Sequence, residues 1–128
     1  MSTLFEPPMG DFLQTVRHRL VVVGSVARRI REPGFIQPKD LDLLCDLDSK
    51  LARKEIQTAV ERLKLKYESP FAACWTFRDY GWMVEILATH HGPDYRVVRR
   101  RANQIDIGGI TFWVAQSEDA PTKKESRS

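Results

Sequence analysis

Three acids that interrupt hydrophobic segments are the residues best suited to chemistry. Asp40 and Asp42 alternate with leucines, and Glu85 lies between valine and isoleucine. Residues two apart in a strand point to the same side, so Asp40 and Asp42 project together while Leu41 faces the core. Two neighbouring carboxylates repel, and Mg²⁺ relieves this by binding one or two carboxylates with phosphate oxygens and water. Taken alone, the pair favours a simpler explanation, an edge strand with a solvated acidic face.

A turn suited to phosphate precedes the acids by 15 residues. The apolar run at residues 20–23 ends at Gly24, and Ser25 begins a predicted short helix through Arg31. Glycine lets a phosphate approach the backbone, and helix-start N–H groups bind anions. A plain strand-to-helix turn has the same sequence. The spacing fits one short helix and a return loop, which would place the turn beside the Asp pair.

Glu85 is the third predicted member of this site. A charged residue within an apolar strand is costly to bury without a partner. If its strand neighbours the strand of Asp40 and Asp42, the three carboxylates form one cluster.

Periodicity predicts the elements that must position these residues. We expect strands at residues 20–23, 40–47, 71–77, 82–87, 104–107 and 110–115, and helices at 11–19, 25–31, 50–65 and 94–102. Residues 79–81 and the pair Gly108-Gly109 predict hairpin turns, and residues 90–93 a loop. Residues 1–9 predict a loose arm. The fold class is therefore α/β (α+β), a mixed sheet flanked by helices on one side with a C-terminal hairpin, in one domain at 1–116 followed by a flexible polar tail at 117–128.

The positive charge is clustered, although the net charge of +3 and pI of about 9.0 are only mildly basic. One group contains Arg28, Arg29 and Arg31, and a second contains Arg96, Arg99, Arg100 and Arg101. Such clusters suit nucleotide or nucleic-acid ligands, and they are equally typical of a solvated face.

The acid and turn motifs together resemble the signature of the nucleotidyltransferase superfamily that includes DNA polymerase β. That signature is Gly-Ser, a spacer, a hydrophobic-flanked Asp-x-Asp, and a later acid on another strand, matched here by Gly24-Ser25, Asp40-Leu41-Asp42 and Glu85. Residues 107–119, followed by Lys123, resemble a hairpin and helix start of stand-alone members. The 15-residue spacer is nearest to stand-alone members, including toxins and antitoxins. The resemblance covers roughly residues 20–127.

The resemblance implies transfer of a nucleoside monophosphate from a nucleoside triphosphate to a hydroxyl on a tRNA-like nucleic acid or a protein. Asp40, Asp42 and Glu85 would hold Mg²⁺ or Mn²⁺ and be catalytic. Gly24, Ser25, Arg28, Arg29 and Lys39 would bind the nucleotide, ATP among the candidates, and the arginines at 96, 99, 100 and 101 would bind the acceptor.

The sequence departs from the family in several respects. The third acid is Glu where Asp is commoner, and Ala120, Pro121 and Thr122 replace apolar residues usual in the terminal helix. We also expect no helical second domain to hold an acceptor. A homodimer or a partner protein would then complete the cleft. Two alternatives therefore stay open: a catalytically silent binding protein of this fold, antitoxin- or inhibitor-like, and a small nucleic-acid-binding module.

Composition limits the remaining classes. No apolar run is longer than the five residues at 71–75, far short of a membrane span, and the N-terminal residues show no signal peptide. Cys45 and Cys74 are predicted to be reduced core residues. We therefore expect a cytoplasmic protein with no membrane partner.

Overall fold

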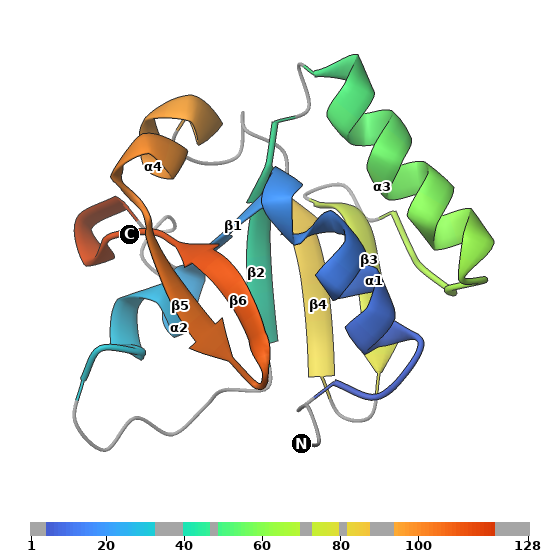
Figure 1. Ribbon diagram of the computed structural model, residues 1–128, viewed down its shortest axis with the longest axis horizontal. Coiled ribbons are helices and arrows are strands. Elements are labelled where there is room, and N and C mark those ends of the chain that lie inside the picture. The colour runs from blue at the N-terminus through green and yellow to red at the C-terminus, as the bar shows by residue number, and fades with distance from the viewer. Residues whose placement is uncertain are drawn as a thin grey trace.

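The described strands form one six-stranded β-sheet, and helices pack against it (Figure 1). The computed structural model describes residues 5–32, 40–46, 49–69, 73–79, 82–87 and 94–119. Its elements are α1 (Met9–Val16), the 3-10 helix η1 (Arg17–Arg19), β1 (Leu20–Val23), α2 (Gly24–Arg29), β2 (Asp40–Cys45), α3 (Lys50–Arg62), β3 (Ala73–Asp79), β4 (Trp82–Leu87), α4 (Tyr95–Arg101), β5 (Asn103–Ile107), β6 (Ile110–Val114) and the 3-10 helix η3 (Ser117–Asp119). This composition confirms the predicted α+β class. The predicted turn residues 80–81 and loop 90–93 lie outside the described residues.

The sheet is mixed, with the strand order β3-β4-β2-β1-β6-β5. Strand β1 pairs antiparallel with β2 and parallel with β6, while β2 pairs parallel with β4. The hairpins β3–β4 and β5–β6 form the two edges of the sheet. Gly108 and Gly109 have φ values of 62° and 90°, as a tight hairpin turn requires. The predicted mixed sheet and C-terminal hairpin are thus confirmed.

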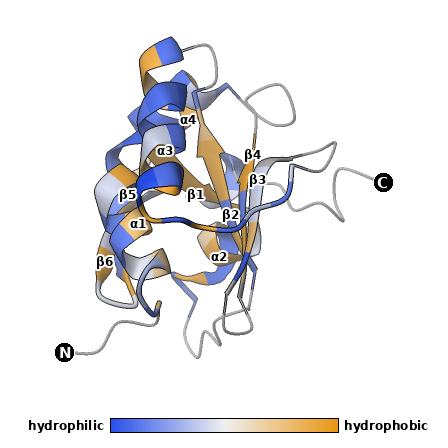
Figure 2. Ribbon diagram, turned by 90° about the vertical axis from the view of Figure 1, so that its right-hand side faces the viewer, coloured by the Kyte–Doolittle hydropathy of each residue, from blue (hydrophilic) through white to orange (hydrophobic). Residues whose placement is uncertain are grey.

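The core lies between the sheet and helices α1 and α3, which share one side of the strands in Figure 2. Leu41 pairs with Val84, and Val84 pairs with Phe77. The ring of Phe77 lies 5.1 Å from that of Phe12 on α1. Directly paired residues point to the same face of a sheet, so α1 covers the face that carries Leu41. Asp40 and Asp42 alternate with Leu41 and therefore belong to the opposite face.

The first residues of the described chain are packed, contrary to the predicted loose arm. Phe5 and Met9 are buried in the core. Their apolar side chains add to the surface that α1 removes from water, which outweighs the loop-forming tendency of the prolines between them.

Helix α3 begins at the predicted residue, Lys50, and buries one apolar face. The Ser49 hydroxyl accepts a hydrogen bond from the Ala52 backbone N–H at 3.1 Å and caps the helix. Ile56 and Val60 are buried, as expected for the apolar side of an amphipathic helix. Leu51, in the first turn of the same helix, is instead 58% exposed.

Candidate active site

Asp42 and Glu85 lie side by side in the sheet. The parallel pairing of β2 with β4 sets Asp42 directly opposite Glu85 and Asp40 opposite Met83. Neighbouring strands are separated by about 4.8 Å, and paired residues point to one face. The structure therefore brings together two acids that are 43 positions apart in the sequence. Asp40 lies two residues before Asp42 on β2.

Exposure decreases across this acidic row. Asp40 is exposed, Asp42 is half-buried, and Glu85 is only 7% exposed. The next residue across the sheet is Thr76 of β3, which pairs with Glu85 and is 4% exposed. Its hydroxyl oxygen is buried without a hydrogen-bond partner among the described residues. Polar groups are costly to bury unless hydrogen-bonded, so a row of this kind suits a polar ligand.

The Gly24 turn contacts the acidic row directly. Gly24 has φ 71°, the left-handed conformation that side chains disfavour. A Cβ atom at this position would lie 3.2 Å from Cβ and Cγ of Asp42 and would collide with its Oδ2 atom. Only glycine therefore permits this approach of the turn to the carboxylate. Ser25 follows, half-buried, at the second position of α2.

The arginines of the first group have different surroundings. Arg28 is half-buried on α2, and its backbone carbonyl accepts a 3.4 Å hydrogen bond from the Ser117 hydroxyl. Arg29 is exposed, with Nε 3.8 Å from Glu32. Lys39, also predicted to contact nucleotide, lies outside the described residues.

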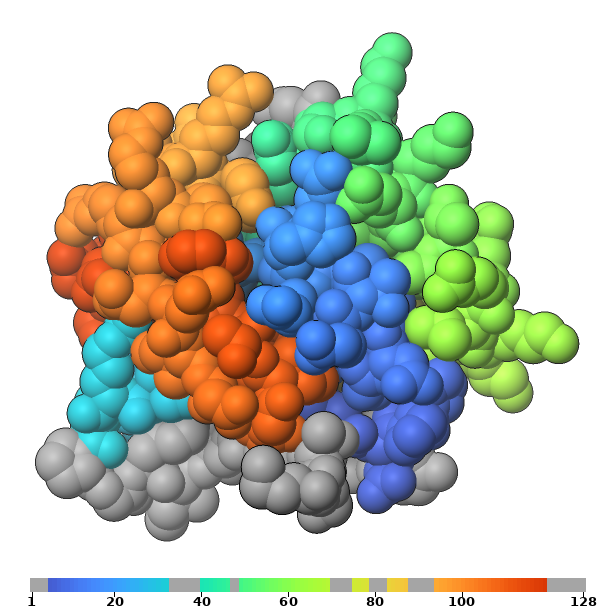
Figure 3. All heavy atoms as spheres, in the orientation of Figure 1, coloured from blue at the N-terminus to red at the C-terminus, as the bar shows by residue number. Residues whose placement is uncertain are grey.

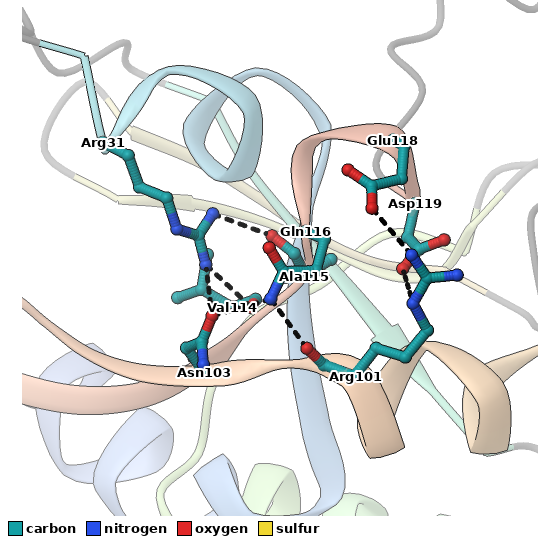
Figure 4. A network of polar contacts seen from close by, with 8 residues as sticks. All are labelled: Arg31, Arg101, Asn103, Val114, Ala115, Gln116, Glu118 and Asp119. Atoms are coloured by element: carbon teal, nitrogen blue, oxygen red, sulfur yellow. Dashed lines mark hydrogen bonds and ion pairs between the residues drawn. The ribbon is translucent and has the colours of Figure 1, made fainter.

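Arg31 holds the end of α2 to the C-terminal hairpin (Figure 4). Its Nη1 atom donates to the carbonyls of Ala27 and Ala115 at 3.2 and 3.0 Å. Its Nη2 atom donates to Oδ1 of Asn103 at 3.3 Å and to the Val114 carbonyl at 3.4 Å. This arginine therefore fixes the position of α2, which begins at the Gly24 turn.

The second arginine group is not beside the acids. Helix α4 lies at the top of Figure 1, where β2 ends, and Arg96 Nε is 3.9 Å from Asp46 Oδ2. Asp40 begins β2, so the two aspartates are separated by about 20 Å along the strand direction. The structure therefore places Arg96, at the start of α4, at the opposite end of β2 from Asp40.

Besides Arg96, two further members of this second group have intramolecular partners. The Arg99 guanidinium carbon lies 3.4 Å from the ring centroid of Trp113, a cation–π contact. Arg101 pairs with Glu118 at 2.7 Å and Asp119 at 3.2 Å and so holds η3 (Figure 4). Arg100 is exposed.

The carboxylate oxygens of the acidic row suit a hard divalent cation, but the three acids are not gathered into one three-ligand cluster. Within the described ranges, no three His, Cys, Asp or Glu side chains are grouped to hold a metal ion. Asp42 and Glu85 provide two adjacent carboxylates. Two carboxylates with phosphate oxygens and water form a usual Mg²⁺ environment, so these residues fit a cation delivered with a triphosphate. Metal binding by Asp40, Asp42 and Glu85 stays a prediction.

An ion-pair cluster on α3 was not predicted. Glu55 accepts hydrogen bonds from Arg19 Nε and Nη2 at 2.7 and 3.0 Å and lies 3.1 Å from His18 Nε2. The hydrogen bonds from Arg19 lower the pKa of Glu55 to about 2, with a smaller contribution from His18. The partners are 36 and 37 positions apart, and no local pattern links them.

Comparison with known proteins supports the fold and nothing finer. No protein-family model matches the sequence, and no curated protein matches it. The fold is similar to the crystal structure of a candidate nucleotidyltransferase from Thermotoga maritima, with a TM-score of 0.51 and 16% sequence identity over 98% of this chain and 84% of the other. The chain therefore has a nucleotidyltransferase-like fold. None of the described helices combines the length and apolar character needed to cross a bilayer.

Proposed function

We propose that this protein is a metal-dependent nucleotidyltransferase that moves a nucleoside monophosphate from a nucleoside triphosphate to a hydroxyl on a nucleic acid or protein. One observation carries the proposal: the Gly24 turn packs against Asp42, which is paired with Glu85. The fold likeness to the Thermotoga maritima protein supports the same class of enzyme.

The order of the strands across the sheet indicates on which side of Asp42 each substrate would bind. The turn after β1 lies on one side of Asp42, and Glu85 lies on the other. The Gly24 backbone, the Ser25 hydroxyl and Arg28 would hold the β- and γ-phosphates, since arginine pairs well with phosphate oxygens. The acceptor hydroxyl would then approach from the side of Glu85.

The acids would act on the two ends of the transfer. A divalent cation bound with the triphosphate would neutralise charge on the phosphates and the leaving group. Asp40 and Asp42 would hold this cation. Glu85 would orient the acceptor hydroxyl and accept its proton. The acceptor oxygen bonds to the α-phosphorus, the bond from that phosphorus to the bridging oxygen breaks, and pyrophosphate leaves.

The decisive experiment compares two aspartates on one segment. Purified protein is incubated with Mg²⁺ and each α-labelled triphosphate, and pyrophosphate release and label transfer are measured. Asp42→Asn should reduce transfer by about a thousandfold, because the charge stabilisation lost amounts to several kcal/mol. Asp46→Asn makes the same chemical change beyond the end of β2 and should leave the rate within a factor of about two. Equal activity of wild type and Asp42→Asn would overturn the assignment.

A second candidate is a binding protein that retains the fold without turnover. The missing three-ligand group among the described residues favours it. Calorimetry would detect triphosphate binding to such a protein, and Asp42→Asn would weaken that binding. No triphosphate would give pyrophosphate release.

The predicted acceptor surface formed by the second arginine group has a separate test. If it binds nucleic acid, the affinity should fall with salt at a log–log slope of about −0.7 to −0.9 per phosphate contacted.

A further inference from the structure

A groove of about 370 Å³ runs between α1 and α3. These helices lie side by side on the face turned to the viewer in Figure 3, α1 in blue and α3 in green. Val16 of α1 and Ala59 of α3 are buried and form its floor. This groove belongs to the helix-covered side of the sheet, whereas Asp42 belongs to the opposite face.

An exposed leucine extends the apolar floor at the N-terminal end of α3. Leu51 lines the groove with its side chain 58% exposed, the most exposed large hydrophobic residue in the described chain. Single exposed leucines are ordinary, but this one is continuous with a concave apolar surface. The groove therefore has a hydrophobic anchor point at one end.

The rim of the groove carries a net positive charge. Lys54 and Arg62 line it, and neither forms an ion pair with a carboxylate in the described part of the chain. Glu55 is the acid in the lining, and Arg19 and His18 already engage it. The two cations therefore remain available to an anionic partner.

The spacing of the lining residues follows a helix. Residues 51, 54, 55, 58, 59 and 62 of α3 recur every three or four positions, so the groove extends along about 16 Å of the helix axis. Helices that bind in grooves use apolar anchors at such spacing over about two to three turns.

We propose that this groove binds an acidic amphipathic helix of a partner protein. Its apolar stripe would cover Leu51, Val16 and Ala59, and acids about two turns apart would pair with Lys54 and Arg62. The inference is independent of the proposed transferase activity, because it uses none of the residues of the acidic row.

The test uses the whole chain and two synthetic amphipathic helices of equal length with the same leucine stripe, one with a Glu-rich and one with a Lys-rich polar face. Binding is followed by fluorescence anisotropy and by backbone NMR shifts. The acidic helix should bind about tenfold more tightly, because its acids pair with Lys54 and Arg62 whereas the lysines of the other probe are repelled by them. Shifts should centre on Thr58 and Ala59.

A matched pair of variants separates the groove from the general charge of α3. Lys54→Glu combined with Arg62→Glu should reverse the preference between probes, while Lys50→Glu combined with Arg53→Glu, exposed positions outside the groove, should retain it. The proposal is wrong if the acidic helix gives no groove shifts at millimolar concentration, or if both double variants respond alike. Self-association on sedimentation that Leu51→Ser abolishes would assign the groove to a second copy and also overturn it.

Discussion

The two ends of β2 carry the same residue types and have different surroundings. At its start, Asp42 lies against the Gly24 turn and beside Glu85, on a face not covered by α1. Beyond its other end, Asp46 lies 3.9 Å from Arg96 of α4. Both ends combine aspartates with a nearby arginine group, and both groups stood out equally in the sequence.

The difference teaches that a glycine, more than the acids or arginines themselves, distinguishes the candidate site from the other end of β2. At the α4 end, Arg99 and Arg101 are engaged with Trp113 and η3. At the other end the backbone approaches a carboxylate where no side chain would fit. Backbone N–H groups and a carboxylate in contact are what a cation–phosphate ligand needs.

The substitution Gly24→Ala should have the largest effect and tests whether the glycine distinguishes the two ends of β2. The change imposes backbone strain at φ 71° and a collision with Asp42, so we expect a loss of about 2–4 kcal/mol in the free energy of unfolding. Gly108→Ala, at φ 62° in the β5–β6 turn, should cost only the backbone part, about 1 kcal/mol. Urea denaturation measures both. Equal losses would show that the contact with Asp42 is unimportant.

Arginine substitutions sharpen the comparison in ligand binding. Arg28→Ala at the Gly24 end should raise the Kd for a magnesium triphosphate about tenfold, the value of one charge-assisted hydrogen bond. Arg100→Ala on α4 should leave that Kd unchanged, because α4 lies at the far end of β2. Isothermal titration calorimetry gives both constants. A tenfold effect at Arg100 would place the triphosphate at the α4 end instead.

Arg31 tests whether the position of α2 depends on the network in Figure 4. Arg31→Ala removes hydrogen bonds to Ala115 and Asn103 and should lower the free energy of unfolding by about 1 kcal/mol. Arg29→Ala removes an exposed 3.8 Å pair and should change it by less than about 0.5 kcal/mol. Thermal unfolding of the two variants compares them, and a larger loss for Arg29→Ala would contradict this account.

Glu55 provides a reference acid that is engaged within the fold by Arg19 and His18 and lies outside the acidic row. Its pKa of about 2 lies below the ordinary 4.5, so folding favours the ionised form. The stabilisation is complete above pH 4.5 and disappears as pH falls towards 2. Glu55→Gln should therefore flatten the loss of stability across that interval. Urea midpoints at several pH values measure it, and an unchanged slope would refute the engagement of Glu55 by Arg19.

Local patterns were sufficient for the elements of this fold. The apolar run that ends at Gly24 forms β1, Ser49 caps α3, and the Gly108-Gly109 pair closes a hairpin. Alternation along β2 correctly placed Asp40 and Asp42 on the face opposite Leu41. Each of these depends on neighbours within a few residues, which the sequence displays directly.

Long-range partners were not accessible to the same reasoning. The pairing of Asp42 with Glu85 depends on the order of strands in the sheet, which no pattern within either strand specifies. The burial of Phe5 and the exposure of Leu51 depend on how α1 and α3 pack. The roles of Arg31 and Arg101 depend on contacts 17 to 84 positions away.

The parallel pairing of β1 with β6 has a consequence for synthesis of the chain. Val22 is opposite Val114, so one side of this central strand stays open until 92 further residues have been translated. At about 5–20 residues per second, the interval is roughly 5–18 s. A nascent chain thus presents one open edge of a valine-rich strand for seconds, and stalled or truncated products should be captured by chaperones or aggregate through it.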